Sequence, residues 1–209
     1  MRKQFYCSYD MPNIYGAQNF RFDPTSEAAI MTLVGADGIN PSSSTNPAYV
    51  NSIEYVHAQT HAGRFFSGGY YNASVANGSS VDVLIQTGVQ AFHAKFDLVA
   101  SGDATVRLYE NATFSAAGTG LTMSNHNRSS AKVFVGTVTH TPTVTGTGTQ
   151  LNGTGYIPAG TKNQTVGGDF GFSNEFILKA STVYLARLTN DSGVAAKMQV
   201  SVAGYEPNL

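Results

Sequence analysis

Residues 92–109 read FHAKFDLVASGDATVRLY, and this stretch decides the fold class. Apolar and polar residues alternate on both sides of a Ser-Gly-Asp turn at positions 101–103. A period of two is typical of β-strands with one buried face, because successive side chains point to opposite sides of a sheet. The sequence therefore predicts two strands that pair as a β-hairpin.

Similar signals recur from about Val50 to the end of the chain. Short alternating or apolar runs lie at residues 81–86, 133–139, 176–178, 183–189 and 198–202. Eight or more such strands predict an all-β fold, a jelly-roll-like antiparallel β-sandwich. The polar stretch 115–130 and the Thr- and Gly-rich stretch 142–168 are predicted as long connections between strands.

The first 48 residues differ from the rest and predict an extended N-terminal arm. Asp23 as N-cap, Pro24 in the first turn and Gly35 after the last turn predict one short helix at about residues 24–34. A Ser- and Pro-rich linker at residues 41–47 then separates the arm, residues 1–48, from a β-sandwich domain, residues 49–209.

The arm is rich in aromatic residues, which is unusual for a solvated tail. Aromatic side chains in an extended segment typically anchor it on another surface. The predicted interface anchors are Phe5, Tyr6, Tyr9, Tyr15, Phe20 and Phe22.

Charge limits the kinds of partner that the sequence favours. Charged residues make up 12% of the 209 residues, and the net charge is −1. Strong nucleic-acid binding driven by counterion release is therefore not expected, and neither is a polybasic membrane patch. No apolar run reaches the length of a membrane span and no secretory signal is recognisable, so we expect synthesis in a cytoplasm. The single cysteine, Cys7, excludes a disulfide within the chain.

The sequence offers little evidence of catalytic or metal chemistry. His57 and His61 are four residues apart, but their surroundings predict a strand, and the Glu of a zinc-protease helix is missing between them. Nucleophile-elbow, phosphate-loop and calcium-loop patterns are absent. We therefore expect no enzyme activity, no metal and no cofactor. A pair of carboxylates for glycoside hydrolysis stays open, because the fold sets their spacing.

Several stretches of the second part resemble small structural proteins of tailed bacteriophages. The stretches, in order, are 91–110, 120–129, 140–144, 157–160 with 166–168, and 176–190; together they cover roughly residues 56–206. The resemblance is to capsid decoration (cement) and head-fibre proteins, and it lies in the order of the pieces rather than in any single motif. The N-terminal arm has no counterpart in it.

The resemblance implies a non-enzymatic virion protein that stabilises the outer surface of a phage head. It also implies the major capsid protein as partner, self-association as a homotrimer, and a location on the capsid surface after synthesis in the host bacterial cytoplasm. The alternative is a host-adsorption or carbohydrate-binding module of the virion, with Tyr70, Tyr71 and Asn72 as the glycan contacts. A glycan hydrolase is the third hypothesis.

Overall fold

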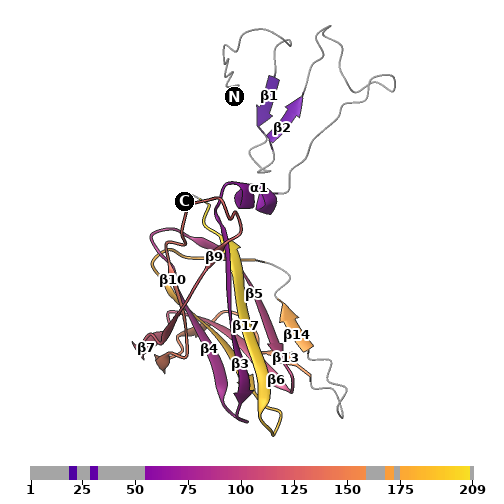
Figure 1. Ribbon diagram of the computed structural model, residues 1–209, viewed down its shortest axis with the longest axis vertical. Helices are drawn as coiled ribbons and strands as arrows, with labels where there is room; N and C mark the ends of the chain where they lie inside the picture. The colour runs from indigo at the N-terminus through magenta and orange to yellow at the C-terminus, as the bar shows by residue number, and fades with distance from the viewer. Residues whose placement is uncertain (1–18, 23–28, 33–54, 159–167, 172–174, 208–209) are drawn as a thin grey trace, which may run out of the picture. The chain divides into compact units, whose positions relative to one another are not determined.

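The computed structural model describes residues 19–22, 29–32, 55–158, 168–171 and 175–207. The chain divides into two units, Met1–Ile53 and Glu54–Leu209. Nearly all the described residues belong to the second unit, which is built from antiparallel strands and one short helix (Figure 1). The all-β fold predicted from the alternating runs is thereby confirmed.

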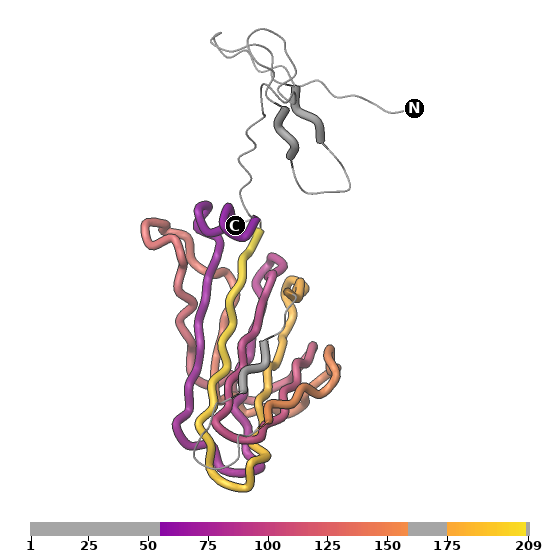
Figure 2. The backbone as a smooth tube through the Cα atoms, turned by 90° about the vertical axis from the view of Figure 1, so that its right-hand side faces the viewer, coloured from indigo at the N-terminus to yellow at the C-terminus, as the bar shows by residue number. Residues whose placement is uncertain are grey.

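Two antiparallel sheets form the layers of a sandwich (Figure 1, Figure 2). Sheet 1 has β17 at its centre, and its strands in spatial order are β14 (Gly168–Gly171), β5 (Phe92–Ala100), β17 (Ala196–Tyr205), β3 (Phe65–Val75) and β9 (Ser124–Asn125), with β15 (Phe176–Leu178) also on β5. Sheet 2 runs β12 (Thr149–Gln150), β6 (Ala104–Glu110), β16 (Val183–Asn190), β4 (Ser80–Gln86), β10 (Thr137–His140) and β8 (Thr119–Leu121), with β13 (Gly155–Ile157) also on β6.

The path of the chain crosses repeatedly from one sheet to the other. The strands β3, β4, β5 and β6 lie alternately in sheet 1 and sheet 2, and so do β15, β16 and β17. Within the sheets this path gives the neighbours β5-β17-β3 and β6-β16-β4. Such an order is consistent with a jelly-roll-like path, in which the first and last strands of the fold pair with each other.

The predicted hairpin of residues 92–109 is wrong. The strands β5 and β6 exist at the expected positions, but β5 pairs with β17 and β6 pairs with β16. The turn at residues 101–103 therefore carries the chain across the core from one sheet to the other. Both strands bury their apolar faces against the opposite sheet, and Gly102 at the turn is itself buried. An alternating pattern fits either arrangement, because it records only which side chains face inward.

The main core lies between the two sheets. Sheet 1 contributes Phe92, Phe96 and Leu98, while sheet 2 contributes Leu108 and Leu188, all with 1% or less of their surface exposed. A second, smaller core lies on the outer side of sheet 2 around Leu84, Ala112 and Leu185. It is covered by a strand pair, β7 (Thr113–Ala116) and β11 (Thr143–Gly146), whose Phe114 and Val144 pack against it.

The two stretches predicted as long connections contain further strands. Residues 115–130 include β8 and β9, and residues 142–168 include β11, β12 and β13. Strand β10 begins at Thr137, so Val133 and Val135 precede it rather than start it. These strands are two to four residues long and rich in Thr and Gly, so their sequences lack the apolar alternation by which longer strands are recognised.

The predicted helix at residues 24–34 is wrong where the structure describes it. Residues Ala29–Thr32 form strand β2, which pairs antiparallel with β1 (Asn19–Phe22) in register Phe20↔Met31. Isoleucine, threonine and phenylalanine favour strands, so pairing of these two segments outweighs the capping signals at Asp23 and Pro24. Residues 24–28, 33 and 34 lie outside the described residues.

The prediction of a strand around His57 and His61 is also wrong, because these residues belong to helix α1 (Tyr55–His61). The helix ends in a Schellman motif. Gly63 has a left-handed φ of 69°, its N–H donates to the carbonyl of Thr60, and the N–H of Arg64 donates to the carbonyl of Gln59, both at 3.0 Å. This cap leads directly into β3 at Phe65.

Candidate interaction surface

The outward side of sheet 1, here called the open face, is an exposed strand surface formed by three long strands. Its residues alternate with the core residues along β3, β5 and β17. The three strands contribute Ser67, Gly69, Tyr71, Lys95, Asp97, Val99, Gln199, Ser201 and Ala203 to it. Small side chains occupy its centre, and charges are few. Such a surface can meet a flat partner closely, since few long side chains must be ordered.

An aromatic row crosses one end of the open face, beside helix α1. Cross-strand register places Tyr205 between Phe65 and His93, and Ile177 next to His93. The rings of His93 and Tyr205 are stacked with centroids 4.5 Å apart, and Tyr55 of α1 packs edge-on against Tyr205 at 5.6 Å. We call Tyr55, Phe65, His93, Ile177 and Tyr205 the aromatic row.

The aromatic row combines a rigid base with exposed tips. Tyr205 is 3% exposed, whereas Ile177 is 64% and Tyr55 is 44% exposed. Glu175 holds His93 and Tyr205 in place, because its Oε1 lies 3.2 Å from His93 Nδ1 and accepts a hydrogen bond of 3.2 Å from the Tyr205 hydroxyl. Exposed apolar groups on a preorganised base are the usual composition of interface anchors.

Sequence reasoning missed the aromatic row. Its members come from residues 55, 65, 93, 177 and 205, which strand pairing brings together. The alternation of residues 92–98 does predict that His93 faces away from the core, but the pairing of β5 with β17 is not visible in local sequence.

The glycan contacts predicted for the alternative reading do not form one cluster. Tyr70 and Asn72 line a hollow of ≈ 140 Å³ together with Ser80, Val81, Asp82, Thr141 and Pro142. Tyr71 lies between them in β3 and is exposed on the other side of the sheet. Tyr70 also stacks on His140 of β10, with ring centroids 3.8 Å apart, and so bridges the edges of the two sheets.

The hollow beside Tyr70 offers polar contacts but few groups that could carry out catalysis. Asp82 is the single carboxylate among the described residues that line it. Arg187 binds both oxygens of this carboxylate, with distances of 2.8 and 2.7 Å. Glycoside hydrolysis needs two carboxyl groups, one of which donates or accepts a proton. A hydrogen-bonding site for a small polar ligand fits these groups better.

A Ser–His pair lies at the edge of the open face. Ser67 Oγ and His126 Nε2 are 2.7 Å apart, and the ring of Phe65 packs edge-on against His126 at 4.7 Å. Nucleophilic catalysis needs a third group that orients the base and donors for the oxyanion. Here the Phe65 ring lies beside the imidazole, so Ser67 and His126 supply only the nucleophile and the base of a catalytic triad.

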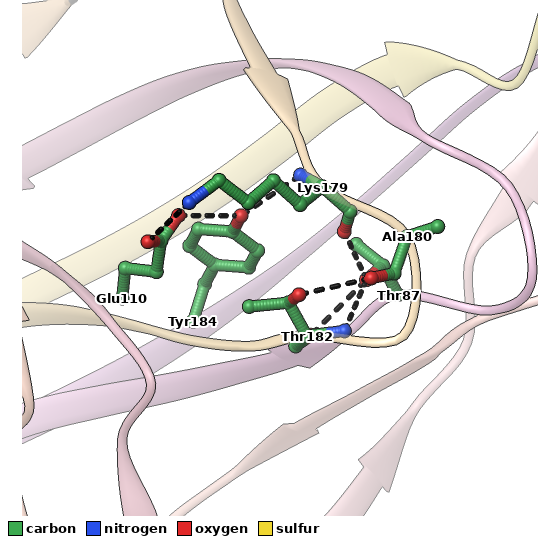
Figure 3. A network of polar contacts seen from close by, with 6 residues as sticks. All are labelled: Thr87, Glu110, Lys179, Ala180, Thr182 and Tyr184. Carbon is green, nitrogen blue, oxygen red and sulfur yellow. Dashed lines mark hydrogen bonds and ion pairs between the residues drawn. The ribbon is translucent and has the colours of Figure 1, made fainter.

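Glu110, Lys179 and Tyr184 form a polar network that locks the turn between β15 and β16 (Figure 3). The Tyr184 hydroxyl donates to Glu110 Oε2 at 2.9 Å and accepts from the Lys179 N–H at 2.8 Å, while Lys179 Nζ binds Glu110 Oε1 at 2.8 Å. Burial, together with the hydrogen bond to Glu110, raises the pKa of Tyr184 to about 12. A tyrosine held protonated in this way is a structural donor and not a base.

Thr87, which directly follows β4, forms hydrogen bonds with the same turn (Figure 3). Its Oγ1 donates to the carbonyl of Lys179 at 2.6 Å and accepts from the N–H of Thr182 at 2.9 Å. These bonds hold Ser181 in a left-handed conformation with φ of 51°. The network thus fixes where Phe176 and Ile177 of β15 join the edge of sheet 1.

Glu206 is a buried carboxyl group just after β17. It has 0% exposure, its Oε2 accepts a hydrogen bond of 3.1 Å from the N–H of Val135, and its Oε1 has no partner among the described residues. Burial raises the pKa of Glu206 above its usual 4.5, and the backbone donors at Val135 and Gly136 oppose part of this effect. Burial therefore makes the charged form less favourable in the folded chain than in the unfolded chain.

We expect Glu206→Gln to change how stability depends on pH. Since folding raises the pKa of Glu206, stability is lost as pH rises through that pKa, and the glutamine variant should gain relative to the parent chain from pH 4.5 towards pH 7. Glu110→Gln is a control of opposite sign, because hydrogen bonds from Lys179 and Tyr184 lower the pKa of Glu110. Urea unfolding at both pH values measures the difference, and parallel pH profiles for all three chains would contradict the assignment.

The arm residues named as anchors lie largely beyond what the structure describes. Phe5, Tyr6, Tyr9 and Tyr15 are outside the described residues. Phe20 and Phe22 belong to strand β1, which pairs with β2. Their role as anchors stays a prediction.

The described part of the chain contains no group of three or more His, Cys, Asp or Glu side chains gathered as for a metal ion. None of its helices is long and apolar enough to cross a bilayer. No family model, curated protein or solved structure matches the chain.

Proposed function

We propose that this chain is a non-enzymatic virion structural protein, a capsid decoration protein that binds the outer surface of a phage head and stabilises it. The observation that carries the proposal is the open face of sheet 1 with its aromatic row. The order of the sequence stretches over roughly residues 56–206 supports it through the resemblance to phage decoration and head-fibre proteins.

The open face suits attachment without chemistry. A decoration protein acts by burying surface across neighbouring capsid subunits, so it needs a flat contact area and a few anchors. Small residues such as Gly69, Ser201 and Ala203 permit close approach, and Ile177 and Tyr55 offer apolar area at one end. Burying these two side chains contributes roughly 1–3 kcal/mol each when they become fully covered.

The proposed partners are the major capsid protein and further copies of the chain. A homotrimer multiplies a modest contact into high avidity where the shell has a threefold site. The proposed location is the capsid surface of the virion, reached after synthesis in the host bacterial cytoplasm.

A measurement of mass in solution tests self-association. Three chains of 22.1 kDa give a particle of about 66 kDa by light scattering after size-exclusion chromatography. A particle of 22.1 kDa at all concentrations would contradict the trimer in solution. It would leave association on the shell as the only form of the proposal.

The proposal predicts that Ile177→Lys weakens binding to heads. The lysine places a charge at an exposed apolar anchor, so we expect the affinity to fall about tenfold or more. Heads of the encoding virus, prepared without this chain, are mixed with purified chain, and the bound fraction is measured after sedimentation. Val194→Lys is the matched control, because Val194 is 68% exposed and lies before β17, at the opposite end of that strand from Tyr205.

Three outcomes of the sedimentation assay differ in meaning. Loss of binding for Ile177→Lys alone supports attachment through the aromatic row. Equal binding of both variants and the parent chain contradicts the row as the contact. No binding of the parent chain contradicts the decoration function.

The second candidate function is carbohydrate binding by a host-adsorption module. It is favoured by the hollow that Tyr70, Asn72 and Asp82 line, where an aromatic ring lies beside hydrogen-bonding groups. A glycan array with the parent chain and Asn72→Ala tests this reading. Binding that disappears in the variant would support it, and an array without any bound glycan would contradict it.

A further inference from the structure

His57 and His61 place two imidazole nitrogens at metal-chelating distance on the surface. Both residues are exposed on helix α1, four positions apart, so they project from the same side of the helix. Their Nε2 atoms are 2.9 Å apart, and the ring centroids are 4.5 Å apart at an angle of 70°. The two Nε2 atoms thus face each other across a hydrogen bond on the outer side of the helix.

The separation of the two nitrogens is short enough for both to bind one metal ion. Two nitrogens that bind one metal at about 2.0–2.1 Å are about 2.9 Å apart if the angle at the metal is a right angle, and about 3.4 Å apart if it is tetrahedral. The 2.9 Å between the Nε2 atoms is the length of the hydrogen bond that joins the rings, and it is also close to the separation that a right-angle site needs. Right-angle sites are typical of tetragonal Cu²⁺ and Ni²⁺, while structural Zn²⁺ is usually tetrahedral.

The helix that carries the pair is held rigidly on the β-domain. Its C-terminal cap fixes the direction of the chain into β3. Asn127 Nδ2 donates to the carbonyl of His61 at 2.9 Å, and the buried Asn125 donates to the carbonyl of Gly63 at 2.9 Å. A chelating pair on a fixed backbone loses little conformational freedom when it binds a metal.

We propose that His57 and His61 form a binding site for a late first-row divalent metal ion, Cu²⁺ above all, with water in the remaining positions. Cu²⁺ ranks highest because nitrogen sites bind it more tightly than Ni²⁺ or Zn²⁺. Binding requires a lone pair on both Nε2 atoms, so each neutral ring carries its proton on Nδ1. The metal then replaces the hydrogen bond that joins the rings in its absence. This site is independent of the proposed decoration function.

The experiment uses the full chain with Cys7→Ser, which removes the one thiol that competes for copper. Cu²⁺ is titrated by calorimetry at neutral pH, and the bound ion is examined by electron paramagnetic resonance. We expect a site whose spectrum shows coupling to two imidazole nitrogens. His57→Gln and His61→Gln should each lower the affinity on the order of 10²-fold, because the second ligand no longer binds within the same molecule.

His126→Gln is the matched control, since His126 is also exposed and lies outside α1. It should retain the affinity and the two-nitrogen spectrum of the parent chain. His57 and His61 are exposed, so circular dichroism should show both glutamine variants folded. An affinity unchanged in His57→Gln and His61→Gln, or a spectrum without imidazole coupling in the parent chain, would overturn the proposal.

Discussion

Gly204→Ala should destabilise the β-sandwich by about 3 kcal/mol or more, the cost of overpacking a rigid core position. Gly204 lies on the inner side of β17, directly against β5. A Cβ added there would lie 1.9 Å from the carbonyl oxygen of His93 and 2.9 Å from Cζ of Phe92. The first of these atoms is backbone and cannot rotate away, so the alanine must push β17 and β5 apart.

Gly120→Ala is the control for this substitution. Gly120 also lies in a strand, β8, but an added Cβ there meets nothing within 4 Å. We expect its free energy of unfolding to stay within about 0.5 kcal/mol of the parent chain. Chemical denaturation of both variants measures the contrast. A Gly204→Ala chain as stable as Gly120→Ala would contradict the pairing of Gly204 with Ala94 that brings β17 onto β5.

Phe96→Ala should cost about 3–5 kcal/mol, the usual range for removing a buried phenyl ring. Phe96 has 0% exposure, sits in the middle of β5 opposite Val202, and packs edge-on against Phe176. Removing the Phe96 ring leaves a cavity between the two sheets, and the surrounding side chains fill it only partly. Since many single domains are stable by 5–15 kcal/mol, this variant approaches the unfolding threshold.

Val99→Ala in the same strand provides the comparison for Phe96→Ala. Val99 is 38% exposed on the open face, so we expect a loss of less than about 1 kcal/mol. The guanidinium midpoints of the two variants measure the difference. Similar midpoints for the two variants would contradict the burial pattern along β5, in which Phe96 faces the core and Val99 faces outward.

The longer strands could be predicted because an alternating strand needs only local information. Along β5, Phe92, Ala94, Phe96 and Leu98 alternate with exposed or half-exposed residues as expected. Strand pairing needs distant information. The alternation in β5 and β6 is the same whether the turn between them closes a hairpin or crosses the core, and only the partners in β16 and β17 decide.

The two errors about helices have different causes. At residues 24–34 the capping signals of Asp23 and Pro24 suit a turn as well as a helix, and Ala29–Thr32 gains more by pairing with Asn19–Phe22. At residues 55–61 the helix is too short to show a clear period. Its strongest signal was Gly63, which a Schellman cap requires in the left-handed region.

The central place of β17 in sheet 1 sets the order in which the protein can fold during synthesis. Residues Phe65–Val75 and Phe92–Ala100 leave the ribosome early, but both pair with Ala196–Tyr205. Until that last segment emerges, β3 and β5 have unpaired edges that favour aggregation. Long-range pairing of this kind makes folding slow, on the millisecond to second scale of β-sandwiches. A nascent chain arrested before residue 196 should therefore lack the strand that joins β3 to β5 in sheet 1.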